Sequence, residues 1–162
     1  MKDNIKVGMA DLKVAADGEV LKTTGLGSCV GLTLYDPTSR VAGMAHIMLP
    51  SSDISREPAF NHAKYADTAV PLLLQSMAQR GASLKRIVAK LAGGAQMFVF
   101  AGQSDTMRIG PRNVETCKLL LHELAIPLLA EDTGANYGRT IELDSTTGLL
   151  MIRSVQYGIK EL

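Results

Sequence analysis

Most strand-like segments in this sequence follow one another directly along the chain, and only two longer helical segments interrupt them. Parallel strands need a long crossover between them, usually a helix, whereas strands that are adjacent in sequence pair through short turns. The order therefore predicts an α+β fold: a layered α/β sandwich of mixed, largely antiparallel sheets with two main helices. The expected strands cover residues 5–15, 19–24, 29–35, 41–49, 87–91, 126–130, 139–143 and 149–155.

Two segments carry apolar residues at helical spacing. The first covers residues 61–80 and contains Pro71. Proline lacks a backbone N–H and clashes with the preceding turn, so we expect a kink or break immediately before it. The second helix is expected to begin at Pro111, with Asn113 as a helix-start residue and Cys117 on the buried face.

The composition is that of an ordinary globular chain. Of 162 residues, 46% are hydrophobic and 20% are charged, which predicts a single domain over residues 1–162. Seventeen basic and sixteen acidic residues leave a formal charge of +1, which argues against a nucleic-acid partner. The sequence shows neither a signal peptide nor a long uncharged apolar stretch, so we expect a cytoplasmic protein without membrane insertion. No cluster of Cys and His residues has metal-ligand spacing.

Cys29 lies where a glycine-rich loop meets a predicted strand. A thiol in such an open position can attack an acyl group once a base makes it a thiolate. Backbone N–H groups of the same loop can hold the resulting oxyanion, and the candidates for that part of the site are Gly27 and Ser28. Glycines also flank cysteines in ordinary tight turns, where the cysteine is a small buried hydrophobe.

The sequence offers three histidines as a base for this thiol: His46, His62 and His122. His122 lies near the end of the second predicted helix, where it stabilises the helix dipole, and His62 lies at the solvated start of the first. His46 lies in an apolar strand that follows the Cys29 strand after a short turn, so pairing would bring the two together. The alternative for His46 is a core histidine that is hydrogen-bonded to a carbonyl.

A third group is needed to fix the imidazole tautomer. Thr23, six residues before Cys29, is the candidate through its hydroxyl or its backbone carbonyl. Because it is neutral, it would stabilise an imidazolium less than a carboxylate would. The alternative is an ordinary β-branched strand residue.

Two motifs resemble the chemoreceptor glutamine deamidase family, CheD, and further matches occur in the same order over nearly the whole chain. The motifs are Gly25-Leu26-Gly27-Ser28-Cys29-Val30-Gly31-Leu32 and Ala45-His46-Ile47-Met48-Leu49-Pro50. The further matches are Lys64-Tyr65-Ala66-Asp67, Gly93-Gly94-Ala95, Ile109-Gly110 with Arg112-Asn113, and Gly138-Arg139.

The resemblance implies a Cys-His-Thr triad of Cys29, His46 and Thr23 on a layered α/β sandwich, working without a metal or cofactor. It implies a protein-glutamine glutaminase that converts glutamines in the cytoplasmic helical region of methyl-accepting chemotaxis receptors to glutamates through a Cys thioester. It also implies binding to CheC, a phosphatase of the response regulator CheY. Two rival readings are a mainly non-catalytic module that binds and stimulates CheC, and a papain-like peptidase or general amidase.

Overall fold

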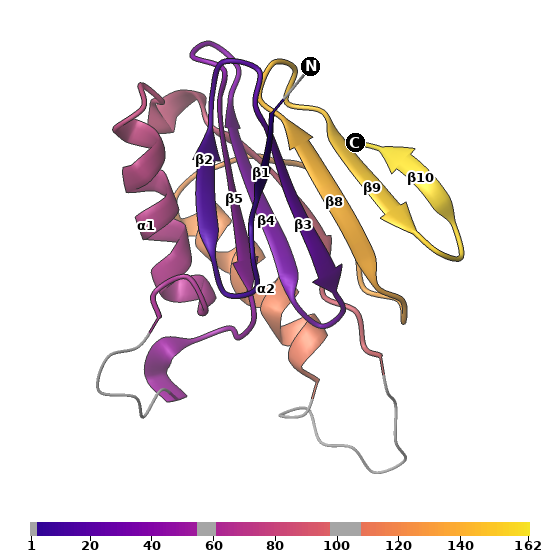
Figure 1. The fold of residues 1–162 in the computed structure, drawn as a ribbon. Coiled ribbons are helices and arrows are strands. Elements are labelled where there is room, and N and C mark those ends of the chain that lie inside the picture. Colours follow the sequence, from indigo (N-terminus) through magenta and orange to yellow (C-terminus); the bar gives the residue numbers. More distant parts are fainter. Residues whose placement is uncertain (1–2, 55–60, 98–107) are drawn as a thin grey trace.

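The computed structural model describes residues 3–54, 61–97 and 108–162. In these residues the chain forms two five-stranded sheets, which lie face to face, and two α-helices cover the outer face of one of them (Figure 1). The result is three layers: one sheet is outermost, the second sheet is in the middle, and the helices lie on the far side of the second sheet. This arrangement confirms the predicted α+β layered sandwich.

Both sheets mix parallel and antiparallel pairs. Sheet A contains, in spatial order, β1 (Asn4–Lys6), β3 (Val20–Leu26), β8 (Arg139–Asp144), β9 (Leu150–Ser154) and β10 (Gly158–Glu161). Sheet B contains β2 (Leu12–Ala15), β5 (Val41–Ile47), β4 (Val30–Asp36), β6 (Val88–Gly93) and β7 (Leu128–Thr133). The pairs β1–β3 and β6–β7 are parallel, and the other neighbouring pairs are antiparallel.

The helices cover sheet B. Helix α1 (Ala66–Ala78) packs on β5 and β2, and α2 (Ile109–Glu123) packs on β4, β6 and β7. Short 3₁₀ turns, η1 (Ser52–Ile54) and η2 (Leu84–Arg86), lie in the connections. One hydrophobic core therefore lies between the helices and sheet B, and a second lies between the two sheets.

The central strands β4 and β5 are buried along their whole length because both faces of sheet B are covered. Side chains alternate between the two faces of a strand. In β4, Val30, Leu32 and Leu34 belong to the helix-side core, whereas Tyr35 belongs to the core between the sheets, as does Cys29 just before the strand. This alternation decides which side chains of β4 and β5 face sheet A.

Several strand boundaries differ from the prediction. The segment 5–15 is two strands in different sheets, because β1 pairs with β3 whereas β2 pairs with β5. The predicted closing hairpin is present as the antiparallel pair β8–β9. Strand β10, which follows it, was not predicted; its four residues are all exposed, so they lack the alternation that marks a strand.

Both helices also differ from the prediction. Helix α1 runs through Pro71 without the predicted break, since burial of Val70, Leu73 and Met77 offsets the lost hydrogen bond. Helix α2 begins two residues before Pro111, which still lies in its first turn. Asn113 is the fifth residue of that helix, so its prediction as a helix-start residue was wrong.

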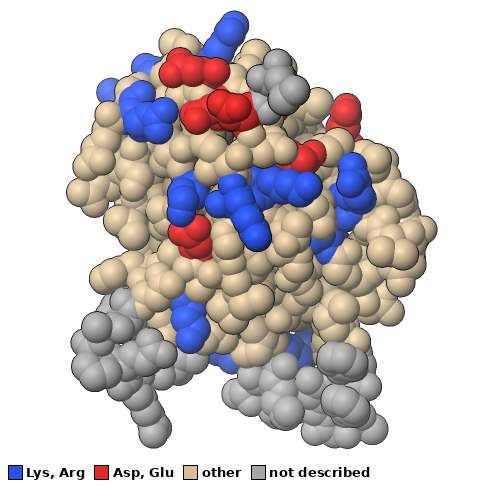
Figure 2. Space-filling view, in the orientation of Figure 1, with Lys and Arg blue, Asp and Glu red and all other residues tan. Residues whose placement is uncertain are grey.

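The surface carries charges of both signs. Lysine and arginine side chains form a row across the middle of the face in Figure 2, and acidic side chains lie mostly above this row. This mixture agrees with the formal charge of +1. Within the three described ranges, no helix has the length and apolar character needed to cross a bilayer.

Candidate active site

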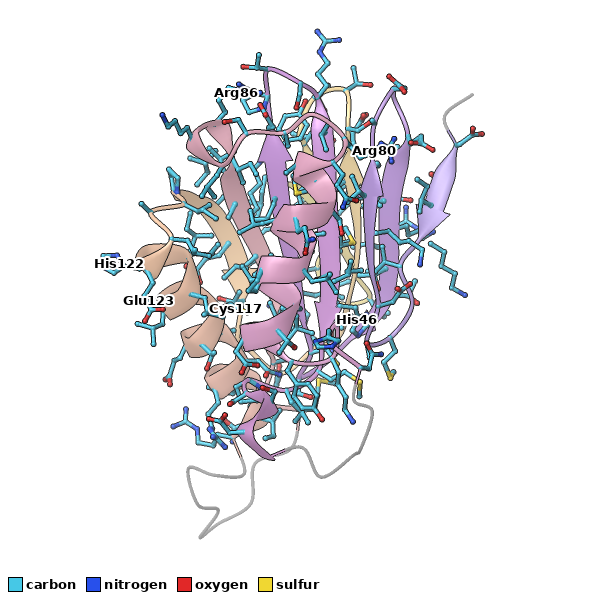
Figure 3. All side chains as sticks on the ribbon, turned by 90° about the vertical axis from the view of Figure 1, so that its left-hand side faces the viewer. His46, Arg80, Arg86, Cys117, His122 and Glu123 are labelled. Atoms are coloured by element: carbon cyan, nitrogen blue, oxygen red, sulfur yellow. The ribbon has the colours of Figure 1, made fainter. Side chains whose placement is uncertain are left out.

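Cys29 and His46 both face the space between the two sheets. His46 lies opposite Gly31 in the β4–β5 pair, and its ring contacts Thr23 of sheet A. Cys29 immediately precedes β4, and its side chain belongs to the core between the sheets. His46 lies at the end of the strands shown at the bottom of Figure 3. The predicted pairing of the cysteine-bearing and histidine-bearing strands is therefore confirmed.

Thr23 approaches His46 from the opposite sheet. Its side chain is buried on β3, and its Oγ1 lies 2.7 Å from His46 Nδ1. The same hydroxyl donates its proton to the Val7 carbonyl oxygen over 2.7 Å. A hydroxyl has one proton, so Thr23 must accept from a protonated Nδ1. The lone pair of His46 is therefore on Nε2.

His46 Nε2 is buried and has no hydrogen-bond partner among the described residues. Such an atom costs stability, because it has lost water without gaining another partner. Nδ1 is held by Thr23, so the ring orientation is fixed and the Nε2 lone pair is available to accept a proton. In chemical terms, the ring is prepared as a base.

Burial keeps both groups neutral at rest. It raises the pKa of the Cys29 thiol, an effect that the residue's own backbone N–H partly offsets. It also lowers the pKa of His46 below the ordinary value of 6.5. The side chains are 8% and 1% exposed, respectively, so the thiol is the more accessible of the two. A neutral thiol beside a neutral imidazole requires proton transfer before or during nucleophilic attack.

The loop before Cys29 is held through its carbonyl groups. The Ala95 N–H donates to Gly27 O over 2.9 Å, and the Gly94 N–H donates to Cys29 O over 2.8 Å. Between them, Ser28 O accepts from the Asn113 side chain over 3.0 Å. Three successive carbonyl oxygens of the loop thus accept hydrogen bonds, two from the residues directly after β6 and one from helix α2.

The oxyanion candidates differ in what their N–H groups do. The Gly27 N–H donates to Gly25 O over 3.1 Å, so it is already engaged. Within the described ranges, the Ser28 and Cys29 N–H groups have no backbone or side-chain oxygen acceptor. These two N–H groups are therefore better placed than that of Gly27 to receive another acceptor.

The remaining cysteine and histidines lie elsewhere. Cys117 is buried between α2 and sheet B, and burial raises its pKa to about 12, which confirms its predicted core position. His62 and His122 are exposed. Sequence reasoning missed Asn113, whose buried amide contacts the Cys29 loop; a polar residue on the apolar stripe of the predicted helix was the available signal.

A cavity of about 480 Å³ lies beside the Cys29 loop. Its lining includes Gly25 and Met97, together with residues 137–140 and 153–156 of sheet A and its connections. Met97 also packs close to Gly27, where an added Cβ would lie 3.4 Å from the Met97 Cγ. The surface next to the loop is therefore recessed.

Sequence comparison finds relatives of this chain over its full length. The sequence model of CheD, described as CheD chemotactic sensory transduction, matches residues 48–154. A chemoreceptor glutamine deamidase CheD of Halalkalibacterium halodurans is 56% identical over 162 residues, which is 100% of both chains. The chain belongs to the CheD family.

Other CheD relatives match almost as completely. A probable chemoreceptor glutamine deamidase CheD of Caldanaerobacter subterraneus is 51% identical over 156 residues, covering 96% of each chain. A chemoreceptor glutamine deamidase CheD of Bacillus licheniformis is 48% identical over 155 residues, covering 96% of this chain and 92% of the relative. The CheD model begins after Cys29 and His46, whereas the full-length relative from Halalkalibacterium halodurans spans both positions.

Proposed function

We propose that this chain is a glutamine deamidase that converts glutamine side chains of chemoreceptors to glutamates, with Cys29 as nucleophile and His46 as base. The observation that carries the proposal is the buried relay from Val7 O through Thr23 to His46 Nδ1, which leaves Nε2 unpartnered on the face of sheet B that also bears Cys29. The printed names of the relatives supply the substrate class.

The first half of the reaction forms a thioester. His46 Nε2 takes the proton of Cys29 Sγ while the sulfur attacks the carboxamide carbon of the substrate glutamine. The carbonyl oxygen becomes an oxyanion, and the N–H groups of Ser28 and Cys29 stabilise it. The imidazolium then donates its proton to the amide nitrogen, the C–N bond breaks, and ammonia leaves.

The second half uses the same groups in reverse. His46 Nε2 accepts a proton from water, and the resulting hydroxide attacks the thioester carbon. The C–S bond breaks, the sulfur recovers its proton from the imidazolium, and the glutamate product leaves. Thr23 accepts from Nδ1 throughout, which keeps Nε2 as the atom that gains and loses the proton. These steps need neither a metal nor an organic cofactor.

The neutral resting state suits this sequence of steps. Burial lowers the pKa of His46, so the imidazole is an unprotonated base at neutral pH. The lost hydration of Nε2 also favours catalysis over a purely structural role, since a binding module gains nothing from an unsatisfied buried nitrogen. This favours an enzyme over a mainly non-catalytic module.

The proposal extends to regulation and location through the family resemblance. The chain would act in the cytoplasm on the helical region of the receptors, and it would bind CheC. The two activities separate in one experiment, since a Cys29→Ala protein that still stimulates CheC would place that function outside the nucleophile. If the folded wild-type protein did not stimulate CheC, CheC would be removed from the proposal, and the deamidation proposal would be unaffected.

The decisive test incubates the purified protein with a chemoreceptor cytoplasmic fragment and follows each glutamine by peptide mass spectrometry. We expect conversion of specific glutamines to glutamates, and hydroxylamine should trap the thioester as a hydroxamate. Backbone cleavage instead of side-chain conversion would indicate a peptidase. Full conversion by the Cys29→Ala protein would refute the nucleophile.

A further inference from the structure

Asn113 is a buried polar side chain that the mechanism above does not use. It is 0% exposed on α2, and its Nδ2 donates to both Ser28 O and Met48 O at 3.0 Å. Ser28 immediately precedes Cys29, and Met48 lies two residues after His46. One amide group therefore bonds to the chain next to the nucleophile and to the chain next to the base.

The orientation of this amide follows from its two neighbours. Both are carbonyl oxygens, which accept hydrogen bonds, so the NH₂ group must face them. The Asn113 Oδ1 is buried without a hydrogen-bond partner among the described residues, which costs stability. The structure tolerates that cost at a position where both amide protons are used to join two segments.

The chain brings α2 close enough for this contact by using glycine. A Cβ at Gly110 would overlap the Ala95 carbonyl oxygen, and a Cβ at Gly94 would overlap the Val114 side chain. The helix start and the segment after β6 therefore approach more closely than larger residues would permit. This approach places Asn113 against a loop that lies 85 residues earlier in the sequence.

The hydrogen bond to Ser28 O also orients the peptide that carries the Cys29 N–H. In a trans peptide the C=O and N–H groups point in opposite directions. With Ser28 O directed at Asn113, the Cys29 N–H is directed away from α2. The Gly27 O bond to the Ala95 N–H orients the Ser28 N–H in the same manner.

We infer that Asn113 is a positioning residue that fixes the Ser28–Cys29 peptide and ties it to the end of the strand bearing His46. It thereby sets the geometry between the thiol, the base and the oxyanion donors. This inference rests on the proposed function for its catalytic consequence, whereas the joining of the two segments stands independently of it. Asn113 itself touches no substrate because it is completely buried.

The kinetic test compares Asn113→Ala with Cys117→Ala, a matched control one turn later on the same buried helix face. Misplacement of reacting groups by about 1 Å costs about 100-fold in rate, so we expect kcat of Asn113→Ala to fall about 100-fold. KM should stay within about twofold, because the interactions lost act on the reacting groups rather than on substrate binding. Cys117→Ala should keep the wild-type kcat. A wild-type kcat for Asn113→Ala would overturn the inference.

Asn113→Asp adds a readout that a merely structural role would not move. The ionised carboxylate donates no hydrogen bond, whereas the protonated acid donates one, and burial raises the pKa of the new group. The ratio of kcat for Asn113→Asp to kcat for wild type should therefore rise as pH falls. The corresponding ratio for Asn113→Ala should stay constant. Two parallel pH profiles would contradict the positioning role.

Hydrogen–deuterium exchange separates this inference from the proposed function. In the full-length Asn113→Ala protein, exchange should increase together in peptides covering Gly27–Gly31 and the end of β5, and Cys117→Ala should leave both unchanged. Unchanged exchange in Asn113→Ala would overturn the joining role whatever the activity. If the wild-type protein converted no receptor glutamine while exchange changed as expected, the proposed function would fail and the joining role would stand.

Discussion

The two ends of the β4–β5 pair use buried polar groups in opposite ways. At one end Asp36 is 0% exposed, and its carboxylate accepts from the backbone N–H groups of Thr38, Ser39 and Ser83. Arg86 adds a two-pronged contact, with Nη2 at 2.8 Å from Oδ2 and Nε at 3.0 Å from Oδ1. At the other end, His46 Nε2 has no hydrogen-bond partner within the described ranges.

Figure 3 shows Arg86 and His46 at opposite ends of the strands. At the Asp36 end, the carboxylate joins the turn between β4 and β5 to Ser83, which follows α1, and to Arg86 of η2. Both of its oxygens are hydrogen-bonded, so these contacts stabilise the fold. At the His46 end, Nε2 is left without a hydrogen bond, and packing in the rest of the molecule has to offset the stability lost by burying it. Polar burial therefore has to be judged atom by atom, since Asp36 and His46 are almost equally buried but only the Asp36 carboxylate has both of its polar atoms hydrogen-bonded.

The largest expected effect breaks the chemistry and spares the fold. Cys29→Ala should lower glutamine conversion about 10⁴-fold or more, since removal of a nucleophile abolishes the covalent route. The melting temperature should fall by less than in Cys117→Ala, because Cys29 is 8% exposed at the edge of its core whereas Cys117 is 0% exposed. Cys117→Ala, the matched control, should keep activity and lose stability instead. Loss of activity in a folded Cys117→Ala protein would contradict the assignment of the two cysteines.

Asp36→Asn should do the reverse. It removes the charge that Arg86 and three N–H groups contact at a completely buried carboxylate, and weakening hydrogen bonds to such a charged group costs about 3 kcal/mol. The melting temperature should fall by about 10 °C for a chain of this size, with kcat preserved below the transition. The exposed substitution Glu123→Gln serves as the control and should change neither.

The difference in stability between wild type and Asp36→Asn should depend on pH in a definite direction. The Arg86 guanidinium and the three N–H groups outweigh desolvation and hold the pKa of Asp36 well below its ordinary value of 3.8. A lowered folded-state pKa contributes stability above the unfolded pKa, and that contribution is lost as pH falls. The stability gap between wild type and Asp36→Asn should therefore shrink below about pH 4. A gap that widened on acidification would contradict the role of the carboxylate.

A smaller effect is expected from Thr23→Val, which keeps the shape of the side chain and removes the acceptor for His46 Nδ1. An unsatisfied buried donor costs about 2 kcal/mol, so kcat should fall about 30-fold. Thr24→Val, at the adjacent exposed position on the same strand, should retain wild-type kcat. Equal kinetics for the two variants would show that the hydroxyl does not orient the ring.

The smallest effect concerns acidification of the site itself. Burial lowers the pKa of His46, so the neutral base persists below pH 6.5 and the acid limb of kcat/KM should lie below that value. Because the pKa of His46 is lower in the folded state than in the unfolded state, neutral His46 contributes fully to folding stability above its unfolded-state pKa. That contribution is lost as pH falls through its folded-state pKa. His46→Gln should remove that part of the decline in urea-unfolding measurements. An acid limb above pH 6.5 would contradict the buried base.

The sequence predicted the parts of the site that depend on local order. His46 lies on β5 and Cys29 immediately precedes β4, and a short turn joins these two paired strands. Thr23 was named as a candidate, but its contact with His46 depends on how sheet A stacks on sheet B. Periodicity within one segment carries no information about that stacking.

The parts that could not be predicted depend on contacts between distant segments. Asn113 was predicted as a helix-start residue. Its contact with Ser28 could not be predicted, because the two residues lie 85 positions apart and residue spacing within one segment does not reveal such a pair. The segment 5–15 looked continuous because both halves are β-prone, yet its halves pair in different sheets. Pro71 has a strong local effect, but the packing of α1 on sheet B outweighs it.

The division of the site between the two sheets has a consequence during synthesis. Thr23, Cys29 and His46 all precede residue 50, but β3 pairs with β8, and Leu26 of β3 lies 113 positions before its partner Arg139. Until β8 is in place, β3 has only β1 beside it in sheet A, so the strand that carries the threonine hydroxyl lacks one of its two neighbours. The proposed active site therefore depends on the folding of a strand that lies far downstream of the three residues it uses.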